Sequence, residues 1–167
     1  PELHASTQTD NRNTEKVKWL HSVGFKRVVL ARELSLEEIK HIHAAAPDVE
    51  LEAFVQGALC VSYSGACYAS LHCFNRSANR GECAQFCRLK FDLYDDNGKL
   101  IEQDRHLLSL KDMSQYDVVE QLIDAGVTSL KIEGRLKNAD YVKNVVAAYS
   151  QRIDEIIARR SDEYRRA

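Results

Sequence analysis

The chain has 167 residues, 44% of them hydrophobic, and its 23 basic and 25 acidic side chains give a formal net charge of −2. This composition excludes wholesale disorder, and the near-balanced charge argues against a generic polyanion binder, although a local basic patch stays compatible with it. No apolar run approaches the roughly 20 residues of a membrane-spanning helix, and no secretory leader is visible, so we expect a cytoplasmic protein. The start at Pro1 and the single methionine, Met113, suggest a segment of a longer protein.

The first 55 residues alternate strand-like and helix-like patterns joined by short links. Strands show alternating or continuous apolar residues, and helices show apolar residues three or four positions apart. Ser35 and Glu38 form a capping box at the start of the second helix. The order β-α-β-α-β predicts parallel β/α units. The expected elements are a strand over 3–8, a helix over 14–23, a strand over 25–31, a helix between 35 and 47, and a strand over 49–55.

The remainder divides into a cysteine-rich stretch, a hairpin and a second α/β stretch. Residues 56–90 show no alternation of strand-like and helix-like patterns and hold all five cysteines, so we interpret them as a functional loop region. Residues 91–105 predict a β-hairpin, with Asn97-Gly98 as its turn. Within 106–160 we expect a helix over 118–125, a strand over 127–132 and a last helix over 139–160, followed by a frayed tail over 161–167.

The five cysteines all fall between Cys60 and Cys87. Their odd number, with no other sign of secretion, disfavours a disulfide framework, and inert buried thiols explain the clustering poorly. Thiolates gathered from one loop suit soft metals. Zinc fits the close pair Cys83 and Cys87, whereas an iron–sulfur cluster takes four thiolates at varied spacing. The spacing alone does not separate these two metals.

Longer motifs connect this loop with a known family. Glu52-Ala53-Phe54-Val55-Gln56-Gly57-Ala58-Leu59-Cys60, followed by Gly65-Ala66-Cys67 and Ser70, resembles the signature of the collagenase-like peptidases of unassigned mechanism, peptidase U family 32. In detail the chain is most similar to the bacterial branch that hydroxylates a cytidine of large-subunit ribosomal RNA. Further similar segments are Leu3 to Gln8, Arg32 to Ser35, Ser77 to Gly81, Cys83 to Arg88, His106 to Ser109, Lys111-Asp112 and Lys131 to Arg135.

This resemblance implies an α/β fold whose parallel β/α units form part of a TIM-like barrel. It also implies oxygen-independent hydroxylation at C5 of a pyrimidine in RNA, with a 4Fe–4S cluster as cofactor and prephenate as co-substrate. The implied cluster ligands are Cys60, Cys67, Cys83 and Cys87, which leaves Cys73 as a spare. Gln56 departs from the pattern, because relatives often carry histidine there, and this weakens any role proposed for that histidine.

Polar residues stand where several predicted strands end. Barrel enzymes place their catalytic groups at the carboxyl ends of strands, so we expect these residues to surround a common mouth with the cysteine loop. Each of them is individually more typical of a structural ion pair or hydrogen bond. An arginine or lysine among them can also hold a dicarboxylate such as prephenate. The candidates are Gln8, Arg32, Glu33, Lys131, Glu133 and Arg135.

The stretch 74–90 is locally basic and interleaves Phe74 and Phe86 with its cations. Positive charge engages phosphates and aromatic rings stack on bases, so this stretch is a candidate surface for ribosomal or, alternatively, transfer RNA. A solvated loop whose phenylalanines shield a cluster explains it equally well. The candidate RNA-binding residues are Arg76, Arg80, Arg88 and Lys90.

Two other functions stay open. The family name suggests a peptidase, yet no G-x-S-x-G or H-E-x-x-H motif occurs, so no catalytic constellation argues for proteolysis. A non-catalytic binding module stabilised by zinc or a cluster is the other alternative. If the strand near Leu3 lies at the open edge of a partial barrel, we expect the chain to pair there with another copy of itself.

Overall fold

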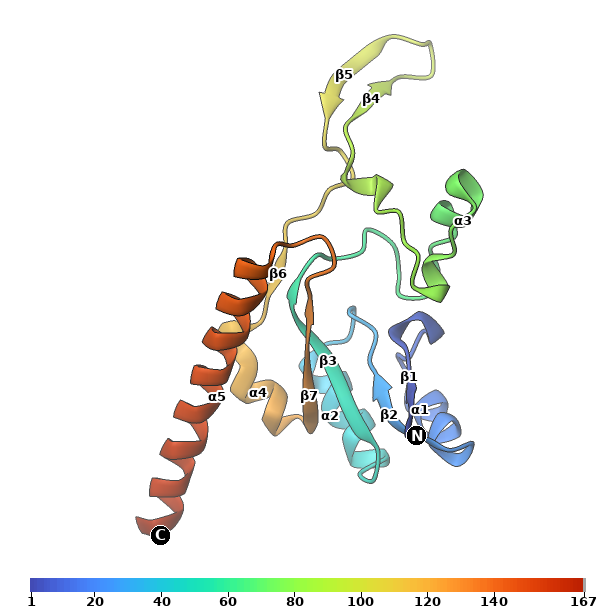
Figure 1. The fold of residues 1–167 in the computed structure, drawn as a ribbon. Coiled ribbons are helices and arrows are strands. Elements are labelled where there is room, and N and C mark those ends of the chain that lie inside the picture. Colours follow the sequence, from blue (N-terminus) through green and yellow to red (C-terminus); the bar gives the residue numbers. More distant parts are fainter. Residues whose placement is uncertain (167) are drawn as a thin grey trace.

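The computed structural model describes the backbone of residues 1–166 and the side chains of residues 1–162. A five-stranded sheet contains β1, β2, β3 and β7 as parallel strands, and the short β6 runs antiparallel to the end of β3. A separate antiparallel hairpin, β4–β5, stands away from this sheet (Figure 1). The structure confirms a mixed α/β fold with a mostly parallel sheet. In the described residues the sheet stays open and does not close into a barrel.

The strands lie close to their predicted positions. The first is shorter than expected, because Ser6 accepts a hydrogen bond from the N–H of Gln8 and begins a 3-10 turn over Thr7–Thr9. The short β6 has no counterpart in the prediction. The strands are β1 (Leu3–Ala5), β2 (Phe25–Val29), β3 (Glu50–Gly57), β4 (Phe91–Tyr94), β5 (Leu100–Arg105), β6 (Met113–Ser114) and β7 (Val127–Glu133).

Side-chain caps fix where the first two helices begin. Asn13 accepts from the N–H of Lys16 at the start of the first helix, and Ser35 and Glu38 form the predicted capping box of the second. A short helix between the cysteines was not predicted. The helices are α1 (Thr14–Ser22), α2 (Leu36–Ala45), α3 (Ala69–Phe74), α4 (Val119–Asp124) and α5 (Ala139–Arg166).

The last helix is longer than the sequence pattern predicts. It runs through residues 161–166, for which the sequence suggests a frayed tail, while Ala167 lies outside the described residues. The apolar stripe ends before Ser161, but neither glycine nor proline follows to stop the helix. No helix within residues 1–166 is long and apolar enough to cross a membrane.

The core lies between the parallel strands and the helices α1, α2, α4 and α5. Val28 and Leu51 in the sheet, and Val17 and Val119 on the helices, have no exposed surface. Burying each such side chain stabilises the fold by about 1.5–3 kcal/mol. This core fixes the carboxyl ends of β1, β2, β3 and β7, and the chain after β3 enters the cysteine-rich segment beyond those ends (Figure 1).

Candidate functional site

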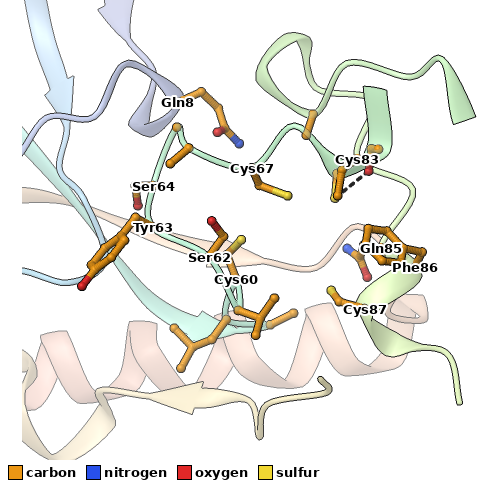
Figure 2. Close-up of a pocket in the computed structure, with 18 of the residues that line it drawn as sticks. Gln8, Cys60, Ser62, Tyr63, Ser64, Cys67, Cys83, Gln85, Phe86 and Cys87 are labelled. Atoms are coloured by element: carbon orange, nitrogen blue, oxygen red, sulfur yellow. Dashed lines mark hydrogen bonds between the residues drawn. The ribbon is translucent and has the colours of Figure 1, made fainter. Parts of the chain in front are cut away.

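A cavity of about 370 Å³ lies where the cysteine-rich segment meets the carboxyl ends of the strands. Four of the five cysteines line it, and Cys73 is the one that does not. Figure 2 shows the side chains of these four thiols directed towards one space. They come from four places in the chain: Cys60 follows β3, Cys67 precedes α3, Cys83 precedes a short 3-10 turn and Cys87 lies within that turn.

The thiols surround the cavity and do not converge on a single point. Within residues 1–162, no three His, Cys, Asp or Glu side chains lie close enough together to hold one metal ion. Burial raises the pKa of the Cys87 thiol, and the neighbouring Cys60 and Cys83 raise it further while Arg88 opposes them. Cys60 and Cys83 therefore lie near enough to Cys87 to disfavour its thiolate, and nearby positive charge such as that of Arg88 favours it.

Glu33 anchors the first part of the cysteine segment to the sheet. Its carboxylate accepts from the N–H of Ser64 at 2.6 Å and from the Ser64 hydroxyl at 3.1 Å. The same hydroxyl accepts from the N–H of Arg32 at 3.3 Å. Gly65 then passes so close to the chain after β1 that a Cβ there would lie 2.5 Å from the carbonyl oxygen of Gln8. These contacts hold Cys60 and Cys67 on either side of a fixed turn.

Arg88 anchors the second part of the segment. Its guanidinium donates to the carbonyl oxygen of Leu59, next to Cys60, and to the hydroxyl of Ser109 and the carbonyl of Leu110. This arginine therefore ties the Cys87 turn to the chain that leaves β3. The geometry gives it a structural role, although the sequence placed it among the RNA-binding candidates.

Arg32 presents to the cavity a guanidinium that forms no ion pair with any side chain in residues 1–162. The group lies 3.8 Å from the ring centroid of Phe54, and its Nε is buried without a hydrogen-bond partner. Burial lowers the pKa of Arg32, while the nearby Cys60 and Glu133 act in the opposite direction. A buried donor without an acceptor costs about 1–3 kcal/mol, so the site favours an anionic ligand that supplies one.

The other predicted strand-end residues divide into two groups. Gln8, Glu133 and Arg135 line the cavity together with Arg32. Glu33 faces Ser64, as described above, and Lys131 donates instead to the carboxylate of Glu52, at 3.0 Å. Glu33 and Lys131 therefore lie outside the cavity lining and support it through these contacts.

The predicted RNA-binding residues divide in the same way. Arg76 and Arg80 are exposed and form no ion pair within the part of the chain whose side chains are described. Lys90 pairs with Asp104 at 2.6 Å, which neutralises its charge, and Arg88 is occupied by the contacts given above. Only the first two thus remain available to a phosphate backbone.

Two residues that support the site were not among the candidates from the sequence: the carboxylate Glu52 and the hydroxyl Ser70. Glu52, 9% exposed in the middle of β3, lies within 3.5 Å of Arg27, 3.0 Å of Lys131 and 2.8 Å of the hydroxyl of Ser129. A carboxylate next to the apolar run Ala53-Phe54-Val55 of β3 was the available signal. Ser70, 1% exposed, was visible only as a signature residue.

Gln56, which the resemblance marks as a departure from the expected family pattern, does not line the cavity. Its amide donates to the hydroxyl of Tyr141 at 3.3 Å, and its Oε1 accepts from the hydroxyl of Tyr149. Tyr149 also donates to the carbonyl of Val55 at 2.7 Å. The departure from the family pattern therefore falls at the contact between β3 and α5.

The chain thus forms an open, mostly parallel β/α sheet with a cysteine-lined cavity at the carboxyl ends of its strands. The model of peptidase family U32 matches residues 1–167, so the chain belongs to that family. It is 55% identical over 161 residues to the 23S rRNA 5-hydroxycytidine C2501 synthase of Escherichia coli (strain K12), an alignment that covers 96% of this chain and 24% of the relative.

Two further relatives show the range of the family. The chain is 40% identical over 163 residues to the tRNA hydroxylation protein P1 of Bacillus subtilis (strain 168), covering 94% of this chain and 38% of that protein. It is 38% identical over 165 residues to a protein named collagenase from Porphyromonas gingivalis, covering 92% of this chain and 40% of that protein. The chain thus spans between a quarter and two-fifths of these relatives. No solved structure matches it.

Proposed function

We propose that the protein containing this chain hydroxylates C5 of a pyrimidine in RNA without molecular oxygen, and that its substrate is a cytidine of large-subunit ribosomal RNA. The observation that carries this proposal is the placement of the four signature cysteines around one cavity at the carboxyl ends of the strands. The 55% identity to a 23S rRNA 5-hydroxycytidine synthase supports the choice of substrate. The strands would form part of a larger TIM-like barrel, whose cavities lie at this edge.

The proposed cofactor is a 4Fe–4S cluster held by Cys60, Cys67, Cys83 and Cys87. Four soft thiols around a cavity, rather than a tight tetrahedron about a point, fit a group wider than a single zinc ion. A bound cluster would supply one-electron chemistry next to the substrate. Arg32, whose positive charge acts on Cys60, would offset part of the negative charge that four thiolates bring.

The chain's own residues would bind and orient the substrates. Arg32 would hold a carboxylate of a prephenate-like dicarboxylate, because its guanidinium is unpaired and partly desolvated. Arg135, which also lines the cavity, would bind the second carboxylate through its guanidinium. Glu133 and Gln8, which both line the cavity, would orient the base: the Glu133 carboxylate would accept a hydrogen bond from it, and Gln8 would donate an amide N–H to it.

The proposed RNA surface surrounds α3. Arg76 and Arg80 offer charge to phosphates, and two exposed rings nearby, Tyr68 at 63% and Phe74 at 49%, offer faces for unstacked bases. Stacking on such rings contributes about 1–3 kcal/mol per base in single-stranded RNA recognition. Because this surface borders the cavity at Tyr68, an extruded base would reach the cavity from it.

Proteolysis is the second candidate, because a relative 38% identical to this chain is named collagenase. Cysteine and serine peptidases need a base beside the nucleophile. The cavity is lined by cysteines and serines but by none of the six histidines, all of which lie within the described residues. The geometry therefore favours RNA hydroxylation over peptide cleavage.

The deciding experiment deletes the gene in its own host and measures hydroxylated pyrimidine nucleosides in purified ribosomal and transfer RNA by mass spectrometry. We expect 5-hydroxycytidine to disappear from large-subunit RNA and to return with the wild-type gene or Cys73→Ser, but not with Cys83→Ser. If the hydroxylated pyrimidine disappears from transfer RNA alone, the substrate is a transfer RNA rather than ribosomal RNA. A persistent modification together with lost peptide cleavage would favour the peptidase.

A further inference from the structure

Ser70 lies behind one of the four cavity thiols and contacts it directly. Its side chain is 1% exposed, and its hydroxyl donates to the Sγ of Cys83 at 3.9 Å, the contact drawn as a dashed line at Cys83 in Figure 2. The same oxygen accepts from the N–H of Ala84 at 3.0 Å. The second contact orients the hydroxyl, because the oxygen is held from the Ala84 side and its proton is left to point at the sulfur.

The local backbone keeps this arrangement in place. Ser70 is the second residue of α3, and its carbonyl oxygen accepts from the N–H of Arg76 at 3.1 Å, beyond the end of that helix. The helix and the segment leading to Cys83 are thus joined at one buried hydroxyl. A serine so placed does more than fill space, since alanine would fill the same volume without the donor.

A hydrogen bond to a thiolate ligand stabilises the more negatively charged, reduced state of an iron–sulfur group. Hydrogen bonds to the sulfurs are one of the factors that set the potentials of such groups, and partners outside the ligand set commonly orient and tune metal ligands. None of the four cavity thiols receives another side-chain hydroxyl within 4.0 Å in the described hydrogen bonds.

We propose that Ser70 is a positioning residue that raises the reduction potential of the bound cluster through its hydrogen bond to Cys83. This inference rests on the cluster assigned under the proposed function. It adds a role for a residue outside the ligand set, and the role is electronic as well as structural.

The test measures the midpoint potential of the cluster by EPR-monitored titration in the anaerobically purified, natural-length protein. Iron and sulfide are quantified first in each sample. Ser70→Ala removes the donor, whereas Ser70→Thr keeps a hydroxyl at the same position. Ser77→Ala serves as the matched control, because it makes the same chemical change in the same segment at a side chain that caps nothing.

We expect Ser70→Ala to shift the potential to more negative values, and Ser70→Thr and Ser77→Ala to match the wild type. A wild-type potential in Ser70→Ala would overturn the inference alone. If Ser70→Ala holds no cluster, Ser70→Thr decides: a wild-type potential supports the role of the hydroxyl, and a shifted potential or a missing cluster contradicts it. A wild-type protein without iron and sulfide would overturn the proposed cofactor, and this inference with it.

Discussion

The carboxylate of Glu33 binds Ser64 through two hydrogen bonds, one from the N–H at 2.6 Å and one from the hydroxyl at 3.1 Å. Glu33 follows β2, whereas Ser64 lies between Cys60 and Cys67. Ser64 is 3% exposed, so its two donors have little access to water. The contact therefore fixes the position of the cysteine segment relative to the sheet.

Replacing Glu33 by alanine should loosen that segment, because it leaves the buried N–H of Ser64 without an acceptor. We expect a loss of about 1–3 kcal/mol in the free energy of unfolding, measured by urea denaturation, together with reduced iron content. Glu37→Ala is the control: this glutamate has a side chain 82% exposed and pairs with the exposed Lys40, so we expect a change within about 0.5 kcal/mol. Equal effects of the two substitutions would show that Glu33 does not anchor the segment.

Gly57→Ala should separate the two longest strands. Gly57 has a φ of +110°, and a Cβ there would lie 2.1 Å from the carbonyl oxygen of Glu133 on β7. Since the obstacle is backbone, we expect a loss of more than about 2 kcal/mol in unfolding free energy. Gly98→Ala, in the hairpin turn at φ +79° with open space around it, should cost only about 1 kcal/mol. Thermal or urea unfolding of both variants measures the difference.

Glu52→Gln should change how stability depends on pH. Burial alone would raise the pKa of Glu52, but hydrogen bonds from Lys131 and Ser129, together with the positive charges of Lys131 and Arg27, outweigh burial and hold this pKa below the usual value. The stabilisation is therefore complete above the ordinary glutamate pKa of about 4.3 and is lost as the pH falls below it.

We expect Glu52→Gln to lower the unfolding free energy by about 1–3 kcal/mol at pH 7, and the gap to the wild type to narrow between about pH 5 and pH 3. Urea denaturation across that range measures it. Exposed Glu15, replaced by glutamine, should give a gap that stays small throughout. A gap for Glu52→Gln that is constant with pH would mean that the charge of Glu52 contributes nothing.

Arg32→Gln should separate binding from stability. Because the guanidinium has no ion-pair partner among the side chains of residues 1–162, its removal should leave the unfolding free energy unchanged or slightly higher, while prephenate binding measured by calorimetry weakens about 10- to 100-fold. Arg27→Gln should do the reverse, since Arg27 pairs with Glu50 at 2.8 Å and with Glu52. Destabilisation by Arg32→Gln with unchanged binding would reduce Arg32 to a structural residue.

Much of the fold follows from local sequence patterns. The capping box at Ser35, the continuous apolar run of β2 and the Asn97-Gly98 turn are each determined by neighbouring residues, and each is confirmed. Short elements were missed where tertiary contacts decide: α3 lies among the cysteines, and β6 exists because two residues pair with the end of β3. The last turns of α5, after residue 160, were not predicted because the apolar stripe ends before the helix does.

The candidate site was only partly predictable for the same reason. The motif identifies the four cysteines that line the cavity, and the strand-end rule identifies Arg32 and Glu133. The sequence could not show that Arg88 and Lys131 are occupied by Leu59 and Glu52, because those partners are distant in the chain. Charge counted along a sequence does not reveal which cations are already paired in space.

The iron and acid-labile sulfide content of the anaerobically purified protein decides whether the four cavity cysteines hold a 4Fe–4S cluster. We predict about four irons and four sulfides per chain in the wild type and in Cys73→Ser, because Cys73 does not line the cavity. Serine at Cys60, Cys67, Cys83 or Cys87 should each remove most of both. One zinc per chain without sulfide, or equal losses in Cys73→Ser and Cys83→Ser, would contradict this prediction.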